Sequence, residues 1–435
     1  MFIGGCLVAG APATTSGTAP ASSAERRQLD ARAVVGEVRR IISKRYVVAE
    51  RRPALDAVLA QGLASGRYNV DDPEVLIERV NADLKRVGRD RHLYLDFDPA
   101  RAAQLAAEGE DSVPDPTAVA ANARARNHGI VELRLLPGNI RYLGYEGDLG
   151  IWVEEETPAA LESAMRFLSG ADAIIIDIRA HRGGTPKPAQ YMLSHFLPAK
   201  KQLYTSYEGN EANPTYTLPT VAAGRMIGKP LYVLTSSNTA SAAEEFAGSV
   251  AGFGIGHVVG ATTAGAGYMN EVLPIDGRFV LSFSTARVLL ASTGRSWEAV
   301  GIIPTVRTDA PQALEVAHVH ALRRLAAKAT GKERTQLQAL TEGFAARVEP
   351  RTAALPMSAY AGRYGERVIV AEGGRLYYQR GTRPRTTLVP LGGNRFAFDN
   401  NPAEHLDFVA KGSSVGAFAL RRPDGSIQGT YERTP

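Results

Sequence analysis

Residues 229–267 read KPLYVLTSSNTASAAEEFAGSVAGFGIGHVVGATTAGAG, and this stretch decides the fold class of the chain. The apolar run 231–234 has the length and composition of a buried parallel strand. A polar turn at 235–239 follows, and the Ala-rich segment from Ser241 to about Val250 predicts a helix. The chain then returns as a second apolar segment at 256–260. The stretch therefore predicts a strand–turn–helix–strand crossover, the unit from which parallel sheets are built.

Ser241 is expected where the strand gives way to the helix, among small residues that leave its hydroxyl accessible. At that point the unpaired N–H groups and the positive dipole end of the helix face any group that reacts there. A nucleophile benefits from this environment because the oxyanion that it creates needs preorganised donors. Serine is also a favoured N-cap residue, so this stretch alone leaves a purely structural role for Ser241 open.

A second crossover precedes the first along the chain. Residues 171–179, ADAIIIDIR, are almost wholly apolar, which predicts a central strand buried on both faces. The loop after it ends in Gly183 and Gly184, whose backbones can approach closely and adopt positive φ. Because the carboxyl ends of parallel strands meet at one edge of a sheet, we expect this loop beside Ser241, where it would supply backbone donors. A glycine pair after a strand is also ordinary turn chemistry.

The N-terminal part of the chain reads as helical. Apolar residues recur at three- and four-residue steps over 29–42 and 55–63, and a third helix is expected over about 73–87. The pattern then changes to alternation around His92, so a helical cap would deliver one histidine onto a strand. An isolated histidine is more often structural, and the pattern alone leaves its role open. Residues 98–126, rich in Ala and Asp, predict an exposed connection.

The pattern of apolar and polar residues changes twice in the remaining segments. A hairpin is expected over about 129–143, and further hairpins over 271–306. Residues 310–345 predict a long charged helix or a helix pair. After Pro350, short alternating segments separated by Gly, Asn and Asp predict a small antiparallel all-β module, a sandwich or a barrel.

Composition and charge narrow the class of protein. The chain has 435 residues, which is long enough for two or three domains. Its 44% hydrophobic and 22% charged residues are typical of a globular protein. The net charge of +5 is spread along the chain, and no basic run is interleaved with aromatics, which argues against a nucleic-acid partner.

Cys6 is the single cysteine, so no intrachain disulfide can form. The small residues before it resemble the pattern that precedes a bacterial lipid-anchored cysteine, and residues 10–25 have the composition of a flexible tether. We therefore expect a signal peptide with a clipped leader and an exported protein, periplasmic or anchored as a lipoprotein through Cys6. The basic and apolar regions of a full leader do not precede Cys6, which leaves an accidental match open.

Four motifs together resemble the C-terminal-processing, or tail-specific, serine peptidases, a superfamily that also holds the tricorn core protease and interphotoreceptor retinoid-binding protein. IIIDIRAHRGG at 174–184 resembles the family's Asp-Leu-Arg-x-Asn-x-Gly-Gly loop, with His181 in place of Asn. TASAAEEFA at 239–247 resembles its nucleophile motif, VVGATTAGAG at 258–267 its Gly-x-Thr-x-Gly-Lys-Gly turn, and EAVGIIP at 298–304 its Glu-x-x-Gly-Val-x-Pro ending. The resemblance covers roughly residues 30–310 and implies a ββα core like those of the crotonases and the Clp peptidases.

One departure from the family pattern selects a mechanism. Family members with a Ser–Lys dyad carry the base in the Gly-Lys-Gly turn, where this chain has Ala266. The branch that resembles tricorn uses a histidine from the N-terminal part and a glutamate near the end of the core. The resemblance therefore implies Ser241 as nucleophile, His92 as base and Glu298 as its carboxylate partner. A Glu298 carboxylate beside the imidazole would raise the pKa of His92.

The same resemblance implies an oxyanion hole made from the backbone N–H groups of Gly184 or Gly183 and of Ala242. It implies a serine peptidase that acts on peptides or proteins, with no metal and no organic cofactor, and it leaves the oligomeric state open. No PDZ-like insertion is recognised, so recognition of a free C-terminus does not follow. The expected divisions are a leader or tether, a helical cap, an α/β core, a helical linker and the all-β module, at 1–28, 29–110, 111–310, 311–349 and 350–435.

Two other functions fit the same fold class. A relative that has lost catalysis would hold an apolar ligand or peptide in the cleft, as the retinoid-binding members suggest. An acyl-CoA enzyme on a crotonase-like core is the third alternative, although such sites do not need a Ser–His–Glu set. Reaction with a fluorophosphonate probe separates the peptidase from the binding protein.

Overall fold

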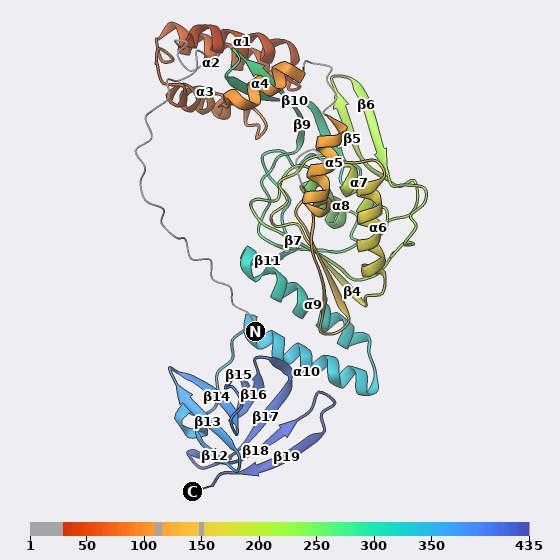
Figure 1. Cartoon of the computed structure of the whole chain (residues 1–435), viewed down its shortest axis with the longest axis vertical. Coiled ribbons are helices and arrows are strands. Elements are labelled where there is room, and N and C mark those ends of the chain that lie inside the picture. Colours follow the sequence, from red (N-terminus) through yellow and green to blue (C-terminus); the bar gives the residue numbers. More distant parts are fainter. Residues whose placement is uncertain (1–28, 109–114, 148–151, 435) are drawn as a thin grey trace.

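The computed structural model describes residues 29–108, 115–147 and 152–434. Three parts follow one another along the molecule, with a helical cap at one end, an α/β core in the middle and a β module at the other end (Figure 1). Cys6 and the expected tether lie outside the described residues. Within the described part, no helix is both long and apolar enough to cross a membrane.

The core is built on a six-stranded sheet with the order β11-β8-β7-β4-β3-β2. Its strands are β2 (Ile130–Leu136), β3 (Ile140–Tyr145), β4 (Ala173–Asp177), β7 (Leu231–Thr235), β8 (His257–Gly260) and β11 (Val306–Arg307). All neighbours are parallel except the β2–β3 hairpin. The two crossovers expected from the sequence are therefore present, with β4 and β7 side by side.

Both faces of this sheet are covered by helices. One face packs against α6 (Glu156–Ser169), α7 (Lys187–Leu193) and α8 (Ala242–Gly252), and the other against α9 (Ala313–Lys328). Successive residues of β4 alternate between the two cores, with Ile174 and Ile176 on the first face and Ala173 and Ile175 on the second. This double burial explains why the first four residues of β4 are all apolar.

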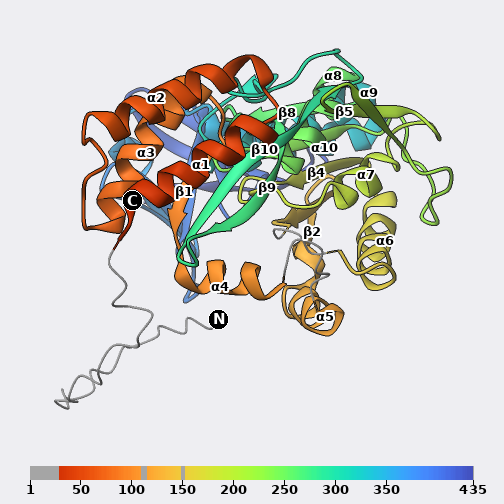
Figure 2. The same ribbon diagram turned by 90° about the horizontal axis from the view of Figure 1, so that it is seen from above.

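A second, five-stranded sheet joins the core to the helical cap. Its strands are β1 (Tyr94–Phe97), β5 (Gln202–Glu208), β6 (Glu211–Tyr216), β9 (Tyr268–Ile275) and β10 (Phe279–Leu290). The long strand β10 pairs with β1 near its start and with β5 near its end, and β9 runs beside it. Apolar residues of β9 and β10 share one core with α1 (Ala31–Arg45), α2 (Arg52–Ala64) and α3 (Pro73–Gly88), which lie over them in Figure 2. His92, just before β1, is thus held against the core by β10.

One segment differs from the expectation, whereas the helix pair is the form that residues 310–345 adopt of the two expected for them. Residues 98–126, expected as an exposed connection, contain α4 (Pro99–Glu108) and α5 (Pro116–Ala125). The proline that opens each helix and the Asp115 cap of α5 were the signals for these helices. Residues 310–345 form a helix pair, in which α9 covers the core sheet and α10 (Gly331–Val348) packs on the β module.

The C-terminal module is all antiparallel. Its helix is α11 (Met357–Tyr360), and its strands are β12 (Gly362–Tyr364), β13 (Arg367–Glu372), β14 (Arg375–Arg380), β15 (Thr386–Gly392), β16 (Arg395–Phe398), β17 (Asn401–Lys411), β18 (Ser414–Arg421) and β19 (Ile427–Glu432). Each strand pairs with the next, and the N–H of Thr434 donates to the carbonyl of Arg363 at 2.9 Å, so the last strand returns to the first. The expected fold class, a ββα-type α/β core with a helical cap and a small all-β module, is confirmed.

Candidate active site

Ser241 occupies a strained turn between β7 and α8. It is the N-cap residue of α8 and has φ 53° and ψ −121°, a left-handed conformation that is unusual for serine. Such backbone strain costs about 1–3 kcal/mol and persists only where the surroundings enforce it. A sharp strand-to-helix turn of this kind lifts a side chain out of the sheet edge, as the nucleophiles of α/β hydrolases require.

Glu244 is the side chain that holds this turn. It is fully buried, and its carboxylate accepts hydrogen bonds from the N–H of Ser241 at 2.9 Å and from the N–H of Ala266 at 2.8 Å. It also accepts from the N–H of Gly265 at 2.7 Å and from Thr263 Oγ1 at 2.5 Å. This role was not among the expectations, although the sequence carries a signal for it, because a serine followed three positions later by glutamate is the signature of a capping box.

Glu244→Gln should therefore be strongly destabilising, whereas Glu245→Gln should not. The amide would present a donor to atoms that already donate to Glu244, with an expected loss of about 3 kcal/mol. The neighbouring Glu245 is also buried, but burial raises its pKa well above the usual value, so it is a neutral acid that an amide replaces with little change. Chemical denaturation of both variants tests this. Equal losses of stability would contradict the role of Glu244.

The loop after β4 lies beside Ser241, as expected from the parallel strands. Thr239 Oγ1 donates to the carbonyl of Ile178 at 2.9 Å, and the N–H of Ala240 donates to the carbonyl of His181 at 3.2 Å. A Cβ built on Gly183 would lie 2.6 Å from the Cβ of Ser241. The glycine is thus required by close approach as well as by its φ of 102°.

The two glycines of this loop have different roles. The N–H of Gly183 donates to Nδ1 of His181 at 3.1 Å, so it is already used within the loop, which favours Gly184 of the two expected oxyanion donors. In the described part of the chain, the N–H groups of Gly184 and Ala242 donate to no other group. His181 is buried, and burial lowers its pKa to about 4. The ring therefore stays neutral and keeps Nδ1 as an acceptor at ordinary pH.

Gly183→Ala is expected to lower kcat/KM by about 100-fold, because the new methyl group displaces Ser241 by a fraction of an ångström or more. The matched control is Gly209→Ala, since Gly209 also has a positive φ of 61° but no atom within 4 Å of a built Cβ. That control should lose only about 1 kcal/mol of stability. Equal activity in the two variants would show that the contact with Ser241 does not matter.

His92, Asp90 and Glu298 form the second half of the site. One ligand atom of each residue lies within 4.8 Å of the others. Asp90 is 7% exposed, and its Oδ1 accepts from the N–H of His92 at 2.8 Å. The structure thus brings together His92 and Glu298, as the sequence predicted. It adds Asp90, whose position two residues before His92 was the signal that the sequence offered.

Glu298 links the backbone next to His92 to the backbone of the 265–267 turn through hydrogen bonds. Its Oε1 accepts from the N–H of Arg91 at 3.1 Å, and its Oε2 accepts from the N–H of Gly267 at 2.6 Å. Burial, and then the charge of Asp90, raise the pKa of Glu298 to about 7. Burial also lowers the pKa of His92, while the charge of Asp90 opposes this. The expectation that Glu298 raises the pKa of His92 is therefore wrong, because desolvation of the ring dominates.

The turn at 265–267 connects the two halves. Gly265 and Ala266 donate to Glu244 beneath Ser241, and Gly267 donates to Glu298 beside His92. Ala266 stands at the place of a dyad lysine, and its side chain is buried. In the described residues no hydrogen bond joins the Ser241 hydroxyl to the ring of His92.

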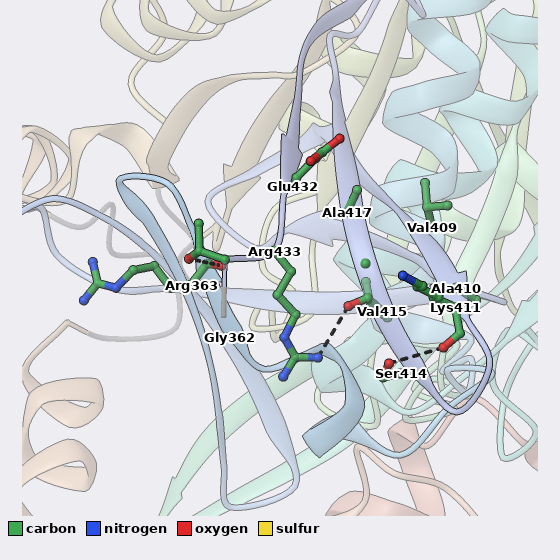
Figure 3. Close-up of a pocket in the computed structure, with 12 residues that line it drawn as sticks. Gly362, Arg363, Val409, Ala410, Lys411, Ser414, Val415, Ala417, Glu432 and Arg433 are labelled. Carbon is green, nitrogen blue, oxygen red and sulfur yellow. Dashed lines mark hydrogen bonds between the residues drawn. The ribbon is translucent and has the colours of Figure 1, made fainter.

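Two features of the molecule are alternative candidate sites, a group of metal-ligating side chains and a hollow on the C-terminal module. Among the residues that the structure describes, one group of three metal-ligating side chains (His, Cys, Asp or Glu) is close enough to hold a metal ion. It consists of Asp90, His92 and Glu298. Figure 3 shows a hollow on the C-terminal module, whose lining includes Arg363, Lys411 and Arg433. Arg433 there donates to the carbonyl of Val415 at 3.4 Å. None of the residues predicted to act in catalysis lines this hollow.

Two family models match the segments that contain His92, Ser241 and Glu298. Residues 140–308 match the family described as peptidase family S41, and residues 26–133 match the N-terminal domain of peptidase S41 in eukaryotic IRBP. A curated carboxy-terminal-processing protease of Bartonella bacilliformis is 24% identical over 176 residues, which is 38% of this chain and 40% of that protein. The chain thus spans less than half the length of this curated relative.

Solved structures with similar folds were also found. A proposed peptidase from Parabacteroides merdae has a TM-score of 0.48 and 19% identity, over 69% of this chain and 99% of that one. The photosystem II D1 C-terminal processing protease has a TM-score of 0.43 and 17% identity, over 67% and 97%. The tricorn protease has a TM-score of 0.40 and 13% identity, over 72% and 37%.

Proposed function

Because this chain belongs to the C-terminal-processing peptidase superfamily, family S41, we propose that it is a serine-type peptidase that hydrolyses peptide bonds. The observation that carries the proposal is the strained Ser241 at the start of α8, held by Glu244 and facing the glycine loop. A structural N-cap needs no such strain. The conformation is explained if the hydroxyl has to reach a substrate.

The proposed reaction uses side chains, backbone and water. Ser241 Oγ attacks the substrate carbonyl carbon while His92 takes the hydroxyl proton, and the carbonyl oxygen becomes an oxyanion. The N–H groups of Gly184 and Ala242 stabilise that oxyanion. The C–N bond then breaks as His92 returns the proton to the leaving amine. Water attacks the acyl-enzyme with the same base, and this step releases the acid and regenerates Ser241.

The histidine base follows from the composition of the 265–267 turn. Ala266 cannot accept a proton, while His92 is neutral at ordinary pH because burial lowers its pKa. Glu298 completes the Ser–His–Glu set by fixing the backbone at Arg91 and at Gly267, which keeps the histidine in register with Ser241. In this proposal His92 is the general base and Glu298 positions it.

A peptide-library digest with mass-spectrometric readout tests the function and reveals the substrate preference. The wild-type chain is expected to cut internal or C-terminal peptide bonds, and Ser241→Ala is not. Intact peptides together with tight binding of an apolar ligand would favour the catalytically inactive alternative. No contact among the described residues favours that alternative over the peptidase.

We also propose that the protein acts outside the cytoplasm and is anchored through Cys6. The small-residue pattern before Cys6 and the tether at 10–25 support this location. Expression of the full-length gene with a radiolabelled fatty acid tests it. Label on the wild type but not on Cys6→Ser is expected, and an unlabelled cytoplasmic protein would overturn the proposal.

A further inference from the structure

In the group formed by Asp90, His92 and Glu298, two buried polar atoms are left without hydrogen-bond partners in the described part of the chain. They are Oδ2 of Asp90 and Nδ1 of His92. A ring nitrogen of His92 and a carboxylate oxygen of Asp90 lie within 4.8 Å of each other. An unpaired donor or acceptor in the interior costs free energy, so the unpaired atoms of these two neighbouring side chains favour a pair that forms in the working state.

The backbone already places the Asp90 carboxylate next to the ring. Its Oδ1 accepts the N–H of His92 at 2.8 Å, so the carboxylate is fixed by the same residue whose side chain it faces. Oδ2 is then available to the imidazole and to the buried hydroxyl of Tyr46, whose pKa is raised by burial and then by Asp90, in part through a hydrogen bond. A carboxylate oxygen has lone pairs for both donors. A ring nitrogen of His92 lies within 4.8 Å of a carboxylate oxygen of Asp90, so a small movement of the side chains is needed to form the hydrogen bond.

Glu298 is less suited to that task because its two oxygens accept from backbone N–H groups of two different segments, which fixes the carboxylate between them. The N–H groups are those of Arg91 and Gly267, which belong to the cap and to the turn near Ser241. Asp90 is also the carboxylate whose charge favours the protonated form of His92, and it raises the pKa of Tyr46 after burial has done so. The charge of Asp90 thus acts on both neighbouring titratable groups, the imidazole of His92 and the hydroxyl of Tyr46.

We propose that Asp90 is the carboxylate that orients His92 and stabilises its protonated form, whereas Glu298 braces the cap against the 265–267 turn. This inference rests on the proposed function and assigns the positioning residue of its base. With Nδ1–H donated to Asp90, the lone pair of Nε2 is free for the proton of Ser241. After proton transfer, Asp90 faces the imidazolium, as the acid of a triad does.

The first test compares Asp90→Asn with Glu298→Gln. The Asn side chain can still accept the N–H of His92, so the backbone should be retained, and thermal melts check this. In Asp90→Asn, kcat should fall about 1,000- to 10,000-fold, as it does when a triad aspartate loses its charge. In Glu298→Gln the loss should be smaller, about tenfold, because its amide oxygen still accepts one backbone N–H.

The second test does not depend on activity. Nuclear magnetic resonance of the ¹⁵N-histidine-labelled full chain, with His92 assigned from His92→Ala, reports the ring tautomer and its titration. We expect a protonated Nδ1 in the neutral ring of the wild type, and a lower His92 pKa in Asp90→Asn because the stabilising charge is gone.

The proposal is overturned if Nδ1 is the unprotonated nitrogen of the neutral ring. It is also overturned if Asp90→Asn keeps kcat within threefold and leaves the His92 pKa unchanged. If the wild type cleaves no peptide while the tautomer and titration are as expected, the proposed function fails and the Asp90–His92 pair stands. The two failures are therefore distinguishable.

Discussion

Ser241→Ala is expected to lower kcat for peptide hydrolysis by about 10⁵- to 10⁶-fold, the scale of loss when the nucleophile of a serine peptidase is removed. Without Oγ no acyl-enzyme forms, and only the oxyanion donors and substrate binding remain. The fold should persist, because the backbone N–H of Ser241 still donates to Glu244 and a lost N-cap costs only about 1 kcal/mol. Steady-state kinetics on the folded variant, with a thermal melt, measure both effects.

A matched control lies in the same turn. Ser237 is exposed there and has no assigned role, so Ser237→Ala should retain wild-type turnover. Near-normal turnover in Ser241→Ala would show that Ser241 is only a structural cap. A large loss of stability in Ser241→Ala would also indicate that Ser241 has a structural role.

His92→Ala should lose about 1,000-fold or more in kcat, because Ala266 leaves no lysine in the turn to take the proton. The wild-type enzyme should also keep its activity at lower pH than free imidazole would allow. His92 must be neutral to accept a proton, and burial lowers its pKa below 6.5, so the neutral form persists to lower pH. The acid limb of kcat/KM is therefore expected below pH 6.5.

A pH–rate series on the wild type and His92→Ala measures this. An acid limb well above pH 6.5 would assign the titration to another group, for which Glu298 with a pKa of about 7 is the obvious candidate. A melting shift with near-normal kcat in His92→Ala would show that the histidine only packs where the cap meets the core. Either result would remove His92 from the role of base.

The sequence predicted the elements with strong local patterns. The apolar runs at β4 and β7 and the small-residue helix α8 required two parallel crossovers, and these place the Gly183 loop beside Ser241. Alternation after Pro350 predicted the β module for the same reason, since each short strand carries its own signal. His92 and Glu298 were brought together by resemblance to a family, because no local pattern links positions 206 residues apart.

The features that the sequence did not reveal depend on the packing of distant segments. Three of the four hydrogen bonds of Glu244 join α8 to residues 263–266, and no periodicity predicts that convergence. The engagement of the Gly183 N–H by His181 likewise depends on one loop conformation. The pKa of His92 was predicted in the wrong direction because a carboxylate nearby is visible in a motif, while burial of the ring is visible only in the fold.

The central claim is that Ser241 is an activated nucleophile, and covalent labelling tests it most directly. The wild-type chain, treated with a fluorophosphonate and analysed by intact mass and peptide mapping, should carry one adduct on the tryptic peptide that contains Ser241. Labelling should disappear in Ser241→Ala and slow markedly in His92→Ala. An unlabelled wild-type protein, or an adduct on a different residue, would contradict the account.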